Sequence, residues 1–146
     1  MTETNQANGN TKKIKLNFKD SKYATGRRKR SIAKVWVKKG SGNIHVNGLK
    51  MNEYFKRPVH QIIVTRPLEI TQVSSNYDVK CSVKGGGLSG QAGAIILGIS
   101  KALIAHDENL KKNLKKDKLT TRDSRVVERK KYGHRKARRS FQFSKR

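Results

Sequence analysis

The C-terminal end of the chain cannot form a folded core of its own. Residues 122–146 hold 11 Lys and Arg side chains against two acidic ones, and they contain almost no aliphatic side chains. A segment of this composition buries too little apolar surface to offset the conformational entropy that folding removes. We therefore interpret residues 122–146 as a tail, and we expect the folded domain to lie before it.

The charge of the whole chain indicates a polyanionic partner. With 35 Lys and Arg against 10 Asp and Glu, the formal net charge is +25 at pH 7. Such an excess of like charge repels itself in the free protein, and binding to an anion relieves the repulsion. The longest apolar stretch, residues 92–103, is much shorter than the roughly 20 residues that span a bilayer. We expect no membrane partner.

Cysteine content and the N-terminal residues indicate a reducing, intracellular compartment. Cys81 is the single cysteine, so the chain can form neither an internal disulfide nor a zinc site built on a cysteine pair. Residues 1–10 lack the apolar region of a signal peptide and the Arg-rich character of a transit peptide. We interpret residues 1–22 as a disordered N-terminal extension.

Residues 23–121 are expected to form one α/β domain. Alternating hydrophobicity predicts three strands, at residues 30–38, 43–46 and 77–83. In the first of these, Ala33, Val35 and Val37 share one face. The other face of the same strand carries Ile32, Lys34 and Trp36.

A short helix is predicted between the second and third strands. Pro58 suits the first turn of a helix, and the helix should stop before Pro67 because proline disfavours helical backbone at the residue before it. Val59, Ile62 and Ile63 are its apolar residues. The next residues, 68–73, fit either a helix or a strand.

Residues 91–106 carry the strongest helical pattern in the chain. Apolar side chains leave almost no polar face, and Lys101 is the only formally charged residue among them. A helix this apolar packs against a sheet. Residues 109–116 are then expected to form a basic helical extension or a turn.

The stretch "GGGLSG" matches the G-x-G-x-x-G pattern of dinucleotide-binding sites through Gly85, Gly87 and Gly90. That pattern also requires a carboxylate on a second strand about 20 residues later, and here the position falls after a helix. No Gly-Lys-Ser/Thr follows either. We interpret the glycines as allowing the helix to approach the sheet or a phosphate closely. We expect no nucleotide and no other cofactor.

Nothing in the sequence indicates catalysis or metal binding. The four histidines are scattered without metal-ligand spacing: His45, His60, His106 and His134. Neither a Ser/His/Asp arrangement nor a pair of carboxylates stands out in a chain with so few acids. We expect no metal site and no enzymatic activity.

Two basic clusters favour RNA binding. The stretch "GRRKRS" at residues 26–31 places four cations just ahead of the first predicted strand. The tail interleaves Lys and Arg with aromatic side chains, namely Tyr132, His134, Phe141 and Phe143. Cations neutralise phosphates, and aromatic and guanidinium planes stack on exposed bases.

Several stretches in order along the chain resemble the universal small-subunit ribosomal protein nine family, in its bacterial or organellar form. They are "GRRKRSIAKVWV", "GNIHVNG", "RPLEIT", "VKGGGLSGQAGAI" and "LTTRDSRVVERKKYGHRKARRSFQFSKR". The resemblance implies a two-layer α/β sandwich, with a four-stranded sheet, helices on one face and a left-handed βαβ crossover. It also implies a structural protein with no cofactor.

The resemblance further implies the partners. The tail of this family threads through ribosomal RNA in the head of the small subunit, beside neighbouring ribosomal proteins, and its last residues reach the peptidyl-site transfer RNA. On this sequence the predicted ribosomal-RNA ligands are Arg27, Arg28, Lys29, Arg30, Arg122, Arg125, Arg129, Lys130, Lys131, Arg135, Lys136, Arg138 and Arg139. The predicted transfer-RNA contacts are Ser144, Lys145 and Arg146.

One departure from the family pattern concerns the helix. A basic pair usually follows "GQAGAI", but here Ile96 and Leu97 stand in its place, so we expect no RNA contact from that turn. The expected location is a bacterial cytoplasmic ribosome, with an organellar ribosome as the alternative.

Two other classes of function compete with the ribosomal one. A basic protein cofactor of an RNA-processing enzyme would share the crossover topology, but the ordered match of the tail disfavours it. An architectural DNA-binding protein would show dimerisation or a helix or wedge for a DNA groove, and neither is evident.

Overall fold

The computed structural model describes residues 18–145. The predicted N-terminal extension, residues 1–22, therefore lies mostly outside the described residues, and Lys22 is already the first residue of a strand. Arg146, the last predicted transfer-RNA contact, also lies outside them.

A five-stranded mixed sheet organises the domain, in the order β1-β2-β5-β3-β4. The strands are β1 (Lys22–Arg28), β2 (Ser31–Lys39), β3 (Ile44–Val46), β4 (Leu49–Lys50) and β5 (Tyr77–Lys84). β3 and β5 are parallel, whereas the other neighbours are antiparallel. The three strands predicted from alternation are confirmed to within one residue at each end.

The expected number of four strands is too low. After β3 the chain reverses at Asn47 and Gly48, which have φ values of 52° and 86°. An Asn-Gly pair with positive φ at both positions is the favoured turn of a two-residue hairpin. This turn adds β4, a two-residue edge strand that is too short to leave a periodic signal in the sequence.

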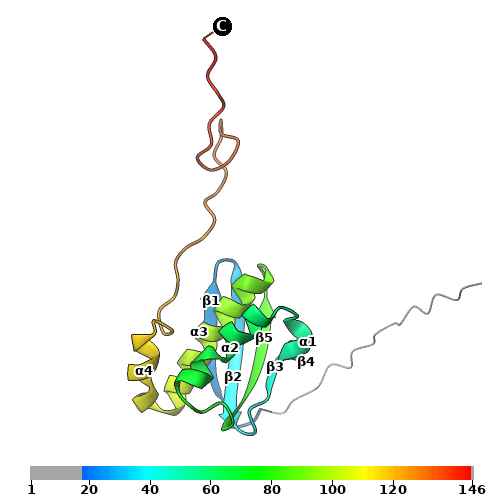
Figure 1. Cartoon of the computed structure of the whole chain (residues 1–146), viewed down its shortest axis with the longest axis vertical. Helices are drawn as coiled ribbons and strands as arrows, with labels where there is room; N and C mark the ends of the chain where they lie inside the picture. The colour runs from blue at the N-terminus through cyan, green and yellow to red at the C-terminus, as the bar shows by residue number, and fades with distance from the viewer. Residues whose placement is uncertain (1–17, 146) are drawn as a thin grey trace, which may run out of the picture.

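Helices cover one face of the sheet, and the layers are visible in Figure 1. The helical elements are α1 (Met51–Tyr54), α2 (Pro58–Ile70), α3 (Leu88–His106), the short 3-10 helix η1 (Glu108–Leu110) and α4 (Lys111–Lys116). α3 packs on β1 and β2, and α2 lies beside α3. Because α2 lies between the parallel strands β3 and β5 in the chain, the fold contains a βαβ crossover. The mixed α/β class is confirmed.

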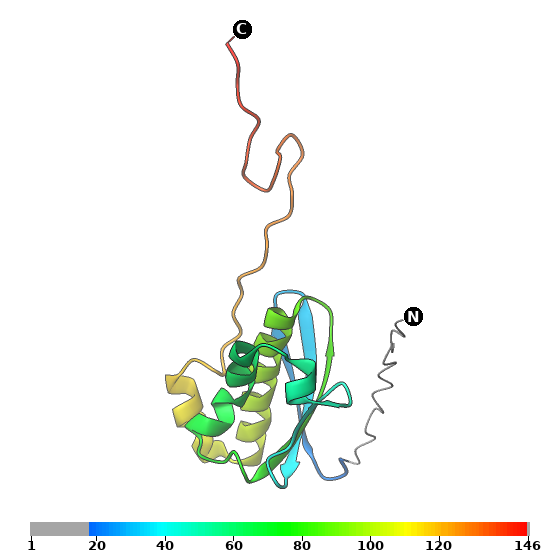
Figure 2. The same cartoon turned by 45° about the vertical axis from the view of Figure 1, so that its right-hand side comes forward.

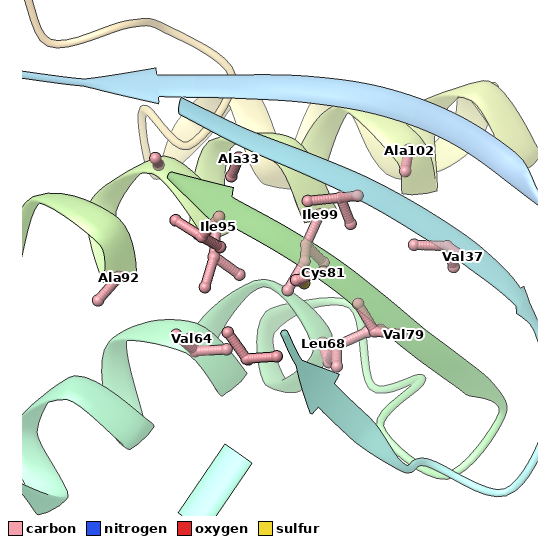
Figure 3. Packing of buried hydrophobic residues seen from close by; sticks show 14 of the residues in the cluster. Ala33, Val37, Val64, Leu68, Val79, Cys81, Ala92, Ile95, Ile99 and Ala102 are labelled. Atoms are coloured by element: carbon pink, nitrogen blue, oxygen red, sulfur yellow. The ribbon is translucent and has the colours of Figure 1, made fainter. Parts of the chain in front are cut away.

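The core lies between the helices and the sheet. Ala33, Val35 and Val37 of β2 are fully buried, as the alternation predicts, and Ile95 and Ile99 of α3 are fully buried opposite them. Figure 3 shows Ile95 and Ile99 on the side of α3 that faces β5. α3 is long and apolar enough to cross a membrane, judged only by length and composition, but here its apolar side chains fill this core.

The helix predicted to begin at Pro58 is α2, and the prediction that it stops before Pro67 is wrong. α2 continues to Ile70, so the ambiguous residues 68–70 are helical. Pro67 and Leu68 are buried in the core, and the Thr71 hydroxyl donates a hydrogen bond to the Pro67 carbonyl at 2.8 Å. Pro67 lies near the C-terminal end of the helix, where the missing N–H removes one bond, and burial of its ring favours the extra turn.

The basic stretch at residues 26–31 lies just ahead of β2, as predicted, but it also includes the end of a strand that the sequence did not predict. Gly26 to Arg28 are the end of β1, and Lys29 and Arg30 form the tight turn into β2. Lys29 has a φ of 50° at this turn. The sequence did not reveal β1 because glycine and consecutive arginines interrupt its alternation.

Gly26 explains why β1 can lie so close to α3. A Cβ atom at this position would fall 1.9 Å from the carbonyl oxygen of Ala94 and 2.6 Å from the backbone nitrogen of Gly98. Both atoms belong to the backbone of α3, so neither can turn aside. The strand and the helix therefore touch backbone to backbone, which positions the residues after Gly26 against the side of α3.

Candidate nucleic-acid interface

The two basic clusters meet at the base of the tail. Nη1 of Arg28, in β1, lies 2.5 Å from a carboxylate oxygen of Asp123. The same nitrogen donates a hydrogen bond to the Arg125 carbonyl at 3.4 Å. On the tail side, Nη2 of Arg125 lies 2.7 Å from the second oxygen of Asp123. We call Arg28, Asp123 and Arg125 the tail clasp.

The environment of Arg28 separates it from the other predicted RNA ligands. Its side chain is only 19% exposed, and its stem packs beside Gly93, where a Cβ atom would lie 2.9 Å from the Arg28 Cγ. Hydrogen bonds from Arg125, together with the charges of Arg125 and Arg28, hold the pKa of Asp123 well below its usual range. The clasp is therefore ionised at neutral pH, and Arg28 positions the tail.

The other cations of the first cluster are exposed. Lys29 and Arg30 lie at the tip of the β1–β2 hairpin, beside the base of the tail. Arg27 alternates with Gly26 and Arg28, so it points to the sheet face that the helices leave open. These three side chains are accessible to a phosphate backbone.

The apolar pair at Ile96 and Leu97 has a structural role. Both residues line a hollow of about 170 Å³ between β1, α3 and the segment that leads from α4 into the tail. Leu119 lines the same hollow and packs on the core. Leu97 is only 5% exposed. The pair therefore supports the chain that carries the tail.

The tail runs away from the domain as an extended segment (Figure 1). The structure places all of its predicted ribosomal-RNA ligands on the surface: Arg122, Arg125, Arg129, Lys130, Lys131, Arg135, Lys136, Arg138 and Arg139. Ser144 and Lys145, two of the predicted transfer-RNA contacts, are exposed near its far end. The tail thus brings cations to points well separated from the core.

A compact turn interrupts the extended tail, as Figure 2 shows. His134 and Ser140 form an antiparallel bridge, and the Arg135 N–H donates to the Arg139 carbonyl at 2.8 Å. Gly133, with a φ of 72°, allows the reversal. The turn gathers Arg135, Arg138 and Arg139 into one short basic loop.

Glu128 organises the cations around this turn. Its carboxylate lies 2.9 Å from Nζ of Lys131 and 2.9 Å from Nε of Arg138. Hydrogen bonds from these two residues lower the pKa of Glu128. The Arg135 guanidinium lies 5.1 Å from the centre of the Phe141 ring, and the ring remains 60% exposed. Cations and open aromatic faces are thus displayed together, as single-stranded RNA requires.

The glycine-rich loop is a packing feature. The Ser31 hydroxyl donates to the Gly85 carbonyl at 3.0 Å, and Ser31 is 1% exposed. A Cβ atom at Gly86 would lie 2.1 Å from the Ser31 hydroxyl oxygen, and one at Gly90 would lie 2.8 Å from it. The loop therefore follows the closed end of the β1–β2 hairpin, and α3 begins at Leu88, three residues earlier than predicted.

Sequence reasoning missed the clasp and the strand that supports it. Asp123 was counted only as one of two acids in the tail, yet it joins two segments nearly a hundred residues apart in sequence. An acidic residue that stands alone in a basic segment was the one sequence feature that could have indicated such an ion pair. Among residues 18–145, no group of three or more His, Cys, Asp or Glu side chains is placed to hold a metal ion.

A comparison with known protein families bears directly on this arrangement. Residues 26–146 match the family described as ribosomal protein S9/S16. The matched region begins within β1 at Gly26 and includes the first basic cluster, the whole helical layer, the tail clasp and the tail.

Proposed function

The chain belongs to the ribosomal protein S9/S16 family, and from this membership we propose that its tail extends through ribosomal RNA to the peptidyl-site transfer RNA. Members of this family are structural proteins of the small ribosomal subunit that bind ribosomal RNA during translation. Their partners are ribosomal RNA and other ribosomal proteins, and their place is the ribosome. These statements hold for this chain as a member.

The finer part of the proposal divides the chain by role. Residues 23–121 form the domain that docks in the subunit head, with the crossover in its left-handed form, and residues 122–146 form the RNA-binding tail. The exposed cations of the hairpin and the tail contact ribosomal RNA. Ser144, Lys145 and Arg146 contact the transfer RNA. The expected setting is a bacterial ribosome, with an organellar one as the alternative.

The proposal rests on how the tail is attached at its base. The tail clasp attaches the first tail residues to β1, while the tail cations beyond it are exposed. A segment held at one end and extended except for one compact turn can reach a site far from the domain (Figure 2). Its terminal cations then meet a phosphate backbone without displacing the domain from its own RNA site.

Deletion of residues 144–146 tests the transfer-RNA contact. Subunits should still assemble, because the other cations of the chain suffice for ribosomal-RNA binding. Hydrogen bonds to charged groups contribute about 1.5–3 kcal/mol, and exposed ones contribute less. Dissociation of peptidyl-site transfer RNA from purified subunits should therefore become several-fold to tenfold faster.

The matched control is the substitution of Lys111→Gln and Lys112→Gln, which removes two exposed cations from α4 and leaves the tail intact. The effect of the deletion should be similar for different transfer RNAs, since phosphate contacts carry no sequence information. Unchanged dissociation would exclude a role at the peptidyl site. Failure of the subunits to assemble would instead assign residues 144–146 to the ribosomal-RNA anchor.

A further inference from the structure

The sheet face opposite the helices is left open by every element that the structure describes between residues 18 and 145. We call it the open sheet face. The strand register sets its residues in rows across β1, β2 and β5. The rows are Tyr23–Trp36–Lys80, Thr25–Lys34–Ser82 and Arg27–Ile32–Lys84. Tyr23 is 50% exposed and Ile32 is 44% exposed, so this face leaves two large, mainly apolar side chains open to solvent.

Aromatic rings and cations alternate on this face. The Tyr23 and Trp36 rings lie 5.3 Å apart at 43°. Nζ of Lys80 lies 5.8 Å from the Trp36 ring, and Nζ of Lys38 lies 4.9 Å from the ring of Phe18, which packs at the edge of the face. These distances are typical of cation–π contacts. The arrangement holds the rings in place and surrounds them with positive charge.

A hollow of about 340 Å³ lies next to the Trp36 ring. Its lining consists of Ile32, Lys34, Trp36, Ser82 and Lys84. The lining thus combines an aromatic and an aliphatic side chain with two exposed lysines. Among residues 18–145, neither Lys34 nor Lys84 has an ion-pair partner. Trp36 and Ile32 suit contact with a flat ring, and the two lysines suit contact with an anion.

The positive charge of the open sheet face indicates which class of molecule can bind there. Asp78 is the one acid on the strands of this face among the described residues, and its carboxylate already accepts hydrogen bonds from the backbone N–H groups of Ser41 and Asn43, at 3.0 and 2.9 Å. The chain's own N-terminal residues are unsuitable because they carry Lys12, Lys13 and Lys15 against Glu3. The occupant must therefore supply negative charge from another molecule.

We propose that the open sheet face binds an unpaired stretch of RNA, with a base stacked on Trp36 in the hollow and phosphates on Lys34 and Lys84. An RNA duplex hides the faces of its bases, whereas unpaired nucleotides offer them for stacking on aromatic side chains. The proposal rests on ribosomal-RNA binding by this family and adds a second RNA surface, on the domain, to the one on the tail.

Trp36 is the only tryptophan in the chain, so its fluorescence reports this face alone. The full-length protein is titrated with oligouridylate, oligoadenylate, an RNA duplex and polyglutamate, while anisotropy of the labelled RNA follows total binding. Single strands should quench Trp36 saturably. The duplex should bind through the tail, as anisotropy shows, and leave Trp36 emission unchanged.

Substituting Lys34→Gln together with Lys84→Gln should weaken the fluorescence-detected binding about fivefold to a hundredfold. The slope of log K against log salt for that binding should also become shallower by about 1.4, the value for two phosphate contacts with a single strand. The matched control is Lys101→Gln with Lys115→Gln, which removes two exposed lysines from the helical side and should change neither quantity.

The outcomes separate this proposal from the general function. If single strands bind by anisotropy without quenching Trp36, the open sheet face does not bind RNA, although the family function stands. If polyglutamate quenches Trp36 and RNA does not, the face is a docking surface for an acidic protein and the proposal is wrong. If no RNA binds at low salt by either measurement, ribosomal-RNA binding itself fails.

Discussion

Arg28 and Asp123 lie 95 positions apart in the sequence, yet their side chains meet at 2.5 Å between Nη1 and Oδ1. This contact joins the end of β1 to the first residues of the tail. Gly26, two residues before Arg28, brings β1 against the backbone of α3, so Arg28 is held between the helix and the tail. The direction in which the tail leaves the domain is therefore set by the packing of β1.

Asp123→Asn should loosen the base of the tail without unfolding the domain. Ion pairs at the surface are screened by solvent, so the free energy of unfolding should hardly change. Trypsin should cleave after Arg122 and Arg125 several-fold faster, because the backbone there is no longer attached to Arg28. Glu128→Gln is the control, since both ion-pair partners of Glu128 in the described part of the chain, Lys131 and Arg138, belong to the tail. Equal cleavage rates in the two variants would contradict the clasp.

The tail clasp should persist into acid. Hydrogen bonds from Arg125, and then the charges of Arg125 and Arg28, lower the pKa of Asp123 in the folded protein. A group with a lowered folded-state pKa contributes stability that is complete above its unfolded value, about 3.9, and disappears as the pH falls through the folded value. Carboxyl chemical shifts of Asp123 should thus show an ionised group at pH 4. A midpoint at or above 3.9 would be inconsistent with the clasp.

The sequence predicted the regular parts of this fold because burial imposes a period on them. Val35 and Val37 alternate with polar residues, and the α3 side chains follow helical spacing, so both elements were found. β1 and β4 were missed for different reasons. β1 contains Gly26 for backbone contact with α3 and cations for its open side, so no simple alternation survives. β4 exists only because the turn after β3 places two residues beside it.

The candidate site also has a part that the sequence could predict and a part that it could not. The exposed cations of the tail were predictable from composition, since a segment that cannot fold must present them to solvent. The positioning role of Arg28 was not predictable from composition, because it depends on Asp123, which lies far away in the sequence. Pro67 shows the converse error, since the local rule for proline was applied where burial in the core favours another helical turn.

Gly26→Ala should lower the free energy of unfolding of the domain by about 1–3 kcal/mol, the usual cost of overpacking a core. The new methyl group would meet the backbone of α3 at Ala94, which has no rotamer with which to avoid it. Gly87→Ala is the matched control, because a Cβ atom there has no heavy atom within 4 Å. Urea denaturation followed by Trp36 fluorescence gives both free energies. A Gly26→Ala protein as stable as the Gly87→Ala protein would refute the close contact of β1 with α3.

Two truncations should separate RNA binding by the tail from its attachment to the domain. A chain that ends at Thr121 lacks Asp123 and leaves Arg28 unpaired, whereas a chain that ends at Val126 keeps the whole tail clasp. Both should fold, since no tail residue from Arg122 to Lys145 belongs to the hydrophobic core. The longer one should be slightly the more stable, because it keeps the ion pair between Arg28 and Asp123.

Both truncated chains should bind ribosomal RNA with a much weaker salt dependence than the full chain. The residues after Val126 include most of the predicted tail ligands, and each phosphate contact contributes about 0.7–0.9 to the slope of log K against log salt. Losing a handful of contacts should flatten the slope by roughly 3. Filter binding to small-subunit RNA over a range of salt concentrations measures it. An unchanged slope would place the RNA contacts on the domain, whereas unfolding of the chain that ends at Val126 would show that the domain depends on the rest of the tail.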